Sequence, residues 1–191
     1  MSGWELVAVV LSVAYLLLAI RESLWCWVCA FISTAIFTFL FWDVNLFMDS
    51  ALNVYYMAMA VYGWWHWRKG SAAGEELPVT SRPARYHLRL IAITLVLSVA
   101  SGAWLTANTP AAWPYLDSFT TWGSVVTTWL VARKVLENWL YWILIDGVSV
   151  GLYIDRGLHL TALLFLAYTV MAVIGYRQWR AHLQRERVGA G

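Results

Sequence analysis

Long apolar runs, separated by short polar segments, dominate the pattern of the chain. A membrane helix needs about 17–25 predominantly apolar residues, and seven runs approach or reach that length. None of them alternates apolar and polar residues as a membrane barrel strand does. The pattern therefore predicts an all-α polytopic membrane protein with seven transmembrane helices. The expected spans are Trp4–Ile20, Leu24–Trp42, Leu46–Trp67, His87–Ala107, Leu116–Ala132, Trp139–Ile154 and Leu158–Trp179.

Composition agrees with a lipid environment. Hydrophobic residues make up 61% of the 191 positions and charged residues 13%, whereas soluble domains are about 45–50% apolar and about 25% charged. The first residues lack the cationic region of a signal peptide, so the first run is expected to remain as a span.

The cationic residues are distributed unevenly over the loops. Seven spans place 12 of the 13 Lys and Arg residues on one side of the membrane and Arg156 alone on the other. Loops rich in Lys and Arg stay in the cytoplasm. We therefore expect a multi-pass protein of a bacterial inner membrane, with the N-terminus outside and the C-terminus in the cytoplasm.

The sequence also repeats itself at an offset of 112 residues, where 14 of 48 aligned positions, from Arg21/Arg133 to Arg68/Arg180, are identical without a gap. Composition alone does not explain the matches of Arg, Asp, Trp and Gly. The matched pairs include Arg21/Arg133, Trp27/Trp139, Asp43/Asp155, Tyr56/Tyr168, Gly63/Gly175 and Trp67/Trp179.

A three-span unit repeated directly would come out inverted, and one intervening span restores its orientation. The expected arrangement is therefore 3+1+3 with parallel repeats, which is common among transporters, and their substrate site lies near the bilayer midplane. The expected units are a first repeat (1–69), a cytoplasmic linker loop (70–86), a linker transmembrane helix (87–110), a second repeat (113–180) and a polar cytoplasmic tail (181–191).

One acid lies deep inside a predicted span. Asp146 shares a helical face with Trp139 and Trp142, at spacings of seven and four residues. A carboxylate beside indole rings suits an organic cation, through Coulomb attraction and cation–π contact. The alternative is a structural or protonated carboxyl inside the bundle.

Four other residues are candidates for the same substrate site. Asn53 lies mid-span with Tyr56 on its face, and its amide can read donors and acceptors, although an interhelical hydrogen bond explains it equally well. Thr34 aligns with Asp146 through the repeat, and Trp122 lies mid-span. The remaining tryptophans at span ends are interpreted as interfacial belt anchors, namely Trp4, Trp42, Trp64, Trp65 and Trp67.

Several chemistries find no support. The chain has no phosphate-loop motif and no His or Cys pattern typical of a metal site, and the lone pair Cys26 and Cys29 is interpreted as packing. The segment Arg133-Lys134 with Glu137 is interpreted as an orientation signal with an i,i+4 pair, with a gate as the alternative. We expect no cofactor, no nucleic-acid partner and no enzymatic activity, because no second catalytic group accompanies Asp146.

Three segments and the predicted plan resemble the PnuC-type vitamin transporters over essentially the whole chain. The segments are Arg133-Lys134-Val135-Leu136-Glu137-Asn138-Trp139-Leu140-Tyr141-Trp142, Tyr62-Gly63-Trp64-Trp65-His66-Trp67 and Leu116-Asp117-Ser118. The resemblance implies a SWEET-like fold, a homotrimer, and facilitated diffusion of a vitamin that a kinase then traps inside the cell.

The resemblance also suggests the solute. It implies nicotinamide riboside, a pyridinium cation, but members of that class tend to carry Gln near the position of Asn53 and Asn at that of Asp146. The extra carboxylate is compatible with nicotinamide riboside and equally with thiamine, which a sister group transports. Riboflavin, uncharged and bulkier, fits less well. A proton-coupled carrier and a structural or receptor subunit remain alternatives.

Overall fold

Seven α-helices account for most of the residues that the computed structural model describes, which are 3–43, 47–72, 77–109, 113–155, 157 and 159–189. Three positions used in predicting the spans and the orientation, Arg156, Leu46 and Leu158, lie outside this described part. The helices are α1 (Gly3–Ile20), α2 (Cys26–Asp43), α3 (Phe47–Ala72), α4 (Ala84–Asn108), α5 (Pro114–Ala132), α6 (Asn138–Asp155) and α7 (His159–Gly189).

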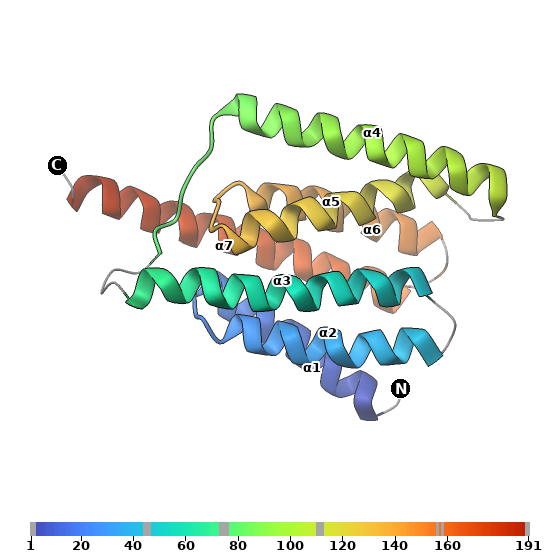
Figure 1. The fold of residues 1–191 in the computed structure, drawn as a ribbon, viewed down its shortest axis with the longest axis horizontal. Helices are drawn as coiled ribbons and strands as arrows, with labels where there is room; N and C mark the ends of the chain where they lie inside the picture. The colour runs from blue at the N-terminus through green and yellow to red at the C-terminus, as the bar shows by residue number, and fades with distance from the viewer. Residues whose placement is uncertain are drawn as a thin grey trace.

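The helices run roughly side by side in one bundle (Figure 1). The most extensive contacts join α1 to α2, α2 to α3, α4 to α5, and α6 to α7, and further contacts join α5 to α6. Two other contacts, α3 with α5 and α1 with α7, connect the early helices to the late ones. In Figure 1, α4 lies along one side of the bundle, over α5.

Within the part of the chain that the structure describes, three helices are long and apolar enough to cross a membrane by length and composition: α1, α4, and the part of α7 from Ala162 to Glu186. An apolar stretch in α2, Cys26–Leu40, is shorter. The surface of α4 is strongly apolar, with Leu88, Val96 and Val99 exposed. Exposing these apolar side chains to water would be unfavourable, and contact with lipid removes that cost. The apolar surface therefore fits a membrane location for this helix.

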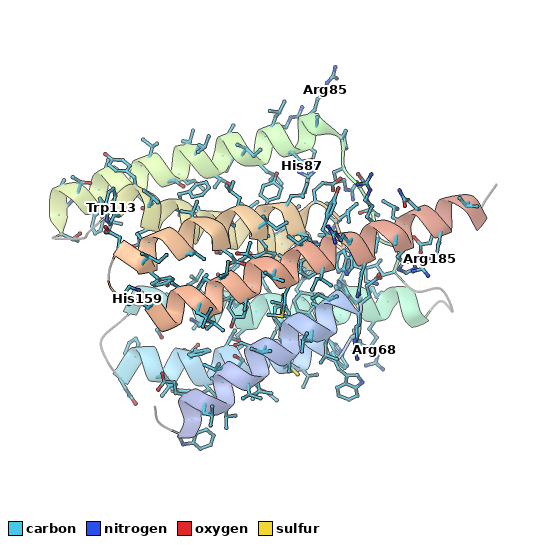
Figure 2. All side chains as sticks on the ribbon, turned by 180° about the vertical axis from the view of Figure 1, so that it is seen from behind. Arg68, Arg85, His87, Trp113, His159 and Arg185 are labelled. Carbon is cyan, nitrogen blue, oxygen red and sulfur yellow. The ribbon has the colours of Figure 1, made fainter. Side chains whose placement is uncertain are left out.

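The C-terminal ends of α1, α3, α5 and α7 lie at one end of the bundle, which we call the cationic pole. Arg68, Arg85 and Arg185 lie at this end, whereas Trp113 and His159 lie at the opposite end (Figure 2). Part of the linker between α3 and α4 also lies at this pole, where Thr80 forms an isolated parallel bridge with Val135. The backbone N–H of Thr80 donates to Lys134 O at 2.9 Å, and that of Leu136 donates to Thr80 O at 2.7 Å.

The turns that follow α1 and α5 have the same geometry. Glu22 and Lys134, which are 112 residues apart, both adopt left-handed backbone with φ of 57° and 49°. The N–H of Glu22 donates to Ala19 O and that of Lys134 to Val131 O. Together with Ser23 to Leu18 and Val135 to Leu130, these bonds form the Schellman pattern, which satisfies the last carbonyls of a helix.

Four tryptophans form a cluster just inside the cationic pole. Trp27 meets Trp67 edge-on with ring centroids 5.3 Å apart, and Trp139 meets Trp179 in the same way at 5.3 Å. The indole N–H of Trp67 donates to Ala132 O, at 3.1 Å. The prediction that Trp67 is a belt anchor is therefore wrong, since only 4% of its side chain is exposed. Its polar atom reaches the end of α5 instead of the interface.

The predicted ion pair between Arg133 and Glu137 is also wrong. Arg133 and Glu137 do not form an i,i+4 pair, because α5 ends at Ala132 and the chain turns at Lys134 before α6 begins at Asn138. Arg133 donates instead to the Tyr62 hydroxyl at 3.2 Å, and Glu137 bonds to the hydroxyl of Ser81.

The polar tail predicted for 181–191 is helical over its described part, because α7 continues to Gly189. His182 stabilises this extension because its ring contacts both Glu22 and, at 3.4 Å, Glu186 one turn further along the helix.

Candidate functional site

A cavity of about 430 Å³ lies inside the bundle. Its walls come from α1, α2, α3, α5, α6 and α7, and no described residue of α4 contributes to them. The volume falls within the range of about 300–1,000 Å³ that is typical of sites for small molecules. The lining combines aromatic rings with hydroxyl, amide and carboxylate groups, so the cavity can hold a ligand that is both aromatic and polar.

Asp146 supplies the carboxylate deepest in the wall. Its residue is 6% exposed and lines the cavity from the middle of α6. Among the described residues it has no hydrogen-bond or ion-pair partner. An ionised group in a water-poor interior is stable only with a counter-charge or hydrogen bonds. The carboxylate is therefore placed to receive a cation from the cavity.

The two tryptophans of α6 differ in their access to this cavity. Trp142 is partly exposed and lines the wall one turn before Asp146. Trp139 also borders the cavity, but it is only 1% exposed and its indole packs edge-on against Trp179. A ligand therefore meets more of the Trp142 ring, while Trp139 forms the floor toward the cationic pole.

Three further predicted residues border the same cavity. Asn53, 8% exposed, and Tyr56 line it from α3, and Thr34 lines it from α2. The Thr34 hydroxyl donates to Ala30 O at 2.7 Å, so it offers a ligand its acceptor lone pairs. The structure thus brings six of the seven predicted residues around one space.

Trp122 is the exception. It is absent from the lining of the cavity, and its indole N–H donates to the Ser101 hydroxyl of α4 at 3.1 Å. Its position in the middle of a span was correct, but the side chain faces α4. Sequence position alone did not reveal which face of the helix meets the cavity.

We expect Trp122→Phe to leave the affinity for a ligand of the cavity within about twofold of the parent, because the lost hydrogen bond, worth about 0.6–2 kcal/mol, lies outside the cavity. Tryptophan-fluorescence titration of the purified variant measures this. A tenfold loss would return Trp122 to the site.

Sequence reasoning missed a row of hydroxyl groups on α5. Thr120, Thr121, Ser124 and Thr128 line the cavity together with Asp117 at the start of the helix. Their spacings of three, four and seven residues are those of one helical face, so this pattern could have been found in the sequence.

Tyr168, also missed, lines the cavity from α7. It is the repeat counterpart of Tyr56, which had been selected, so the repeat itself was the overlooked signal. Wall positions are further fixed by Ser33, whose hydroxyl lies 2.6 Å from that of Ser12 and donates to Ala8 O at 2.9 Å.

A polar, solute-sized cavity enclosed by helices with apolar outer faces is typical of a membrane transport protein. Comparison with known proteins gives the family. The family profile "Nicotinamide mononucleotide transporter" matches residues 2–181. The chain belongs to this family of membrane transporters, so it is a multi-pass inner-membrane protein and not an enzyme, and the resemblance to PnuC-type transporters is confirmed.

Individual relatives differ in the vitamin they carry. The chain is 28% identical over 185 residues to the riboflavin/roseoflavin transporter RibM of Streptomyces davaonensis, covering 95% of this chain and 86% of the relative. It is 24% identical over 173 residues to the nicotinamide riboside transporter PnuC of Escherichia coli, covering 78% and 72%. A crystal structure of the vitamin B3 transporter PnuC has the same fold, with a TM-score of 0.75 at 23% identity over 96% of this chain and 83% of that one.

Proposed function

We propose that this protein takes up nicotinamide riboside, or a closely similar cationic vitamin, across the inner membrane by facilitated diffusion. The observation that carries the proposal is the carboxylate of Asp146, buried in the cavity wall without a partner among the described residues. A cationic aromatic solute would neutralise it and contact the neighbouring Trp142 ring. Asn53 and Tyr56, which line the cavity from α3, would bind the polar parts of the solute.

We also propose the 3+1+3 arrangement of parallel repeats, with α4 as the linker helix. The composition of the cavity supports it, because many lining residues come in pairs 112 positions apart. These pairs are Ser12/Ser124, Leu16/Thr128, Trp27/Trp139, Ala30/Trp142, Ser33/Ile145, Thr34/Asp146, Phe37/Ser149, Asn53/Phe165 and Tyr56/Tyr168.

Equivalent positions in the two proposed halves carry different chemistry. Ala30 and Thr34 in the first half correspond to Trp142 and Asp146 in the second. The second half would thus bind the charged ring, and the hydroxyl and amide groups of the first half would bind the rest of the solute. Rocking of the halves around this solute would give alternating access.

For orientation we propose that the cationic pole faces the cytoplasm, in accord with the positive-inside rule, so the N-terminus lies outside. A homotrimer and trapping of the solute by a kinase are further proposals from the family resemblance.

Riboflavin is the second candidate. RibM, a riboflavin/roseoflavin transporter, matches 95% of this chain, and an aromatic-lined cavity also suits a flavin ring. Riboflavin is uncharged, however, and would leave Asp146 without a counter-charge. Thiamine, a thiazolium cation, satisfies Asp146 as nicotinamide riboside does.

Parallel tryptophan-fluorescence titrations of the purified protein with nicotinamide riboside, thiamine and riboflavin test the proposal. We expect at least one cation to bind ten or more times as tightly as riboflavin, because only a cation neutralises Asp146. A tenfold ratio of dissociation constants corresponds to about 1.4 kcal/mol. Tightest binding of riboflavin would replace the cationic proposal by the second candidate.

The same protein in proteoliposomes tests the mechanism. Uptake of the bound vitamin should continue when an ionophore removes the proton gradient. Collapse of uptake would favour the proton-coupled alternative.

A further inference from the structure

The cationic pole contains an ion pair that the transport site does not use. Nζ of Lys134 lies 2.8 Å from Oε2 of Glu22, and their side chains are only 4% and 11% exposed. Glu22 follows α1, whereas Lys134 follows α5. The pair therefore joins the first proposed half of the protein to the second.

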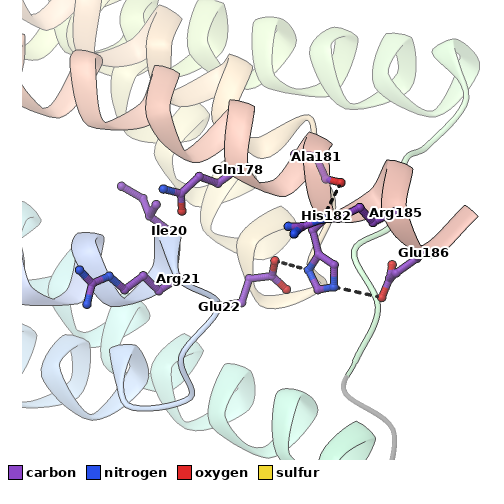
Figure 3. Close-up of a pocket in the computed structure, with 8 residues that line it drawn as sticks. All are labelled: Ile20, Arg21, Glu22, Gln178, Ala181, His182, Arg185 and Glu186. Carbon is purple, nitrogen blue, oxygen red and sulfur yellow. Dashed lines mark hydrogen bonds and ion pairs between the residues drawn. The ribbon is translucent and has the colours of Figure 1, made fainter. Parts of the chain in front are cut away.

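Both charges have further partners. Lys134 Nζ also donates to Leu77 O at 3.0 Å and lies 4.8 Å from the centre of the Trp67 ring. The other carboxylate oxygen of Glu22 lies 2.6 Å from Nδ1 of His182 on α7. A dashed line marks this contact in Figure 3. A buried ion pair needs such additional contacts to compensate for the hydration it has lost.

The pair occupies equivalent positions of the repeat. Arg21 and Arg133, immediately before it, are identical in the two halves, but the next position is Glu22 in one and Lys134 in the other. Equivalent positions that contact each other lie where the halves meet, close to the axis that relates them. Two identical charges would repel there, and this chain has an acid opposite a base.

Buried tryptophans join the two proposed halves beside this ion pair. The indole N–H of Trp67 donates to Ala132 O, and that of Trp179 donates to Ala19 O, each at 3.1 Å. Both bonds run from one proposed half to the other, and all four residues are buried. Solute in the cavity can reach this pole only if these contacts separate.

We propose that Glu22 and Lys134 form a lock that closes the cavity at the cationic pole and opens when solute leaves on that side. The proposal rests on the function proposed above, because alternating access requires the halves to part here. Separating the two charges exposes each to a poorly hydrated environment, so the pair favours the closed state. The linker carbonyl of Leu77 holds the lysine in place on the second half.

Thiol labelling of a reporter in the cavity tests the lock without any vitamin. The parent carries Thr128→Cys, a buried position in the cavity wall near the floor, with Cys26 and Cys29 replaced by Ala. A membrane-impermeant maleimide is applied to sealed vesicles of both orientations. We expect Glu22→Gln to increase labelling from the cationic-pole side by about tenfold or more, because loss of one partner leaves a buried charge unpaired.

A double variant tests whether Glu22 and Lys134 act as a pair. Lys134→Gln should accelerate labelling in the same way, and Glu22→Gln with Lys134→Gln should act no more strongly than either single change, since interacting residues are not additive. Additive effects would overturn the proposal.

Glu137→Gln is the matched control, because it removes the same charge at the same pole. Glu137 contacts Ser81, the N–H of Arg82 and, at 3.6 Å, His87, but not α1 or Lys134. We expect this variant to label like the parent.

Unchanged labelling of Glu22→Gln would overturn the lock. Faster labelling from both sides would also overturn it, because it would indicate general loosening of the bundle. Since no vitamin is present, a failure of the proposed solute to bind leaves the labelling result intact.

Discussion

Replacing Asp146 by Asn is expected to reduce the affinity for nicotinamide riboside or thiamine by about 30-fold or more. Removing one member of a buried charge pair costs about 2–5 kcal/mol, and Asp146 is 6% exposed in the cavity wall. The amide has almost the same shape as the carboxylate, so packing should be preserved. Fluorescence titration of the purified variant gives the ratio of dissociation constants.

The specific part of this prediction is the contrast between ligands. Riboflavin carries no charge, so its affinity should change by less than about threefold, which corresponds to about 0.65 kcal/mol and lies near the lower end of the roughly 0.5–1.5 kcal/mol of a neutral hydrogen bond. A loss that is equal for cationic and neutral vitamins would instead indicate a structural role for Asp146.

Asp117→Asn provides a matched control within the same cavity. Asp117 also lines the cavity, but it is exposed at the beginning of α5. Exposed charges interact by only about 0–1 kcal/mol, so this variant should lose less than about fivefold in affinity for the cation. If it loses as much as Asp146→Asn, the solute binds nearer the opposite pole than proposed.

The second large effect is expected from Gly175→Ala. A Cβ atom at Gly175 would lie 2.8 Å from the indole of Trp139, well inside van der Waals contact. Trp139 is almost fully buried and also packs against Trp179, so it has little room to move. Overpacking of this kind costs about 1–3 kcal/mol. The melting temperature in detergent should fall by several degrees, and vitamin affinity should fall because Trp139 forms the cavity floor.

Gly151→Ala in α6 controls for the change in helix propensity. Nothing lies within 4 Å of a Cβ placed at Gly151. Alanine favours helix over glycine by up to about 1 kcal/mol, so this variant should melt at or above the parent temperature. A Gly175→Ala protein that is as stable as the parent would show that the Trp139 contact adapts without strain.

The predicted spans and the helices of the structure agree because both depend on short stretches of sequence. Membrane thickness sets the length of each apolar run, and the hydrogen bonds of a helix join residues four positions apart. Leu116–Ala132 corresponds to α5, Pro114–Ala132, and Trp139–Ile154 corresponds to α6, Asn138–Asp155. The predictions fall short where α3 continues to Ala72. Hydropathy marks where apolar side chains stop, but a helix continues for as long as its backbone bonds and side-chain contacts favour it.

Part of the candidate site could also be predicted from short stretches of sequence. Asp146, Trp142 and Asn53 stood out because polar groups and helical spacing can be read along one span. Trp122 was assigned to the site as well, yet it faces Ser101 on α4. Which face of a helix meets the cavity depends on its neighbours, and these were unknown.

The sequence by itself determined the seven helical segments, the buried acid and the 112-residue repeat, because each of these depends on residue type and spacing within the chain. Only the tertiary structure decided that Trp67 belongs to a buried cluster, that Lys134 pairs with Glu22, and that Glu137 bonds to Ser81 and not to Arg133. These contacts join residues that are far apart in sequence, and they follow from a left-handed turn and the packing of α1 on α7 and of α3 on α5. No local periodicity encodes such pairings, since their free energy depends on which helices lie side by side.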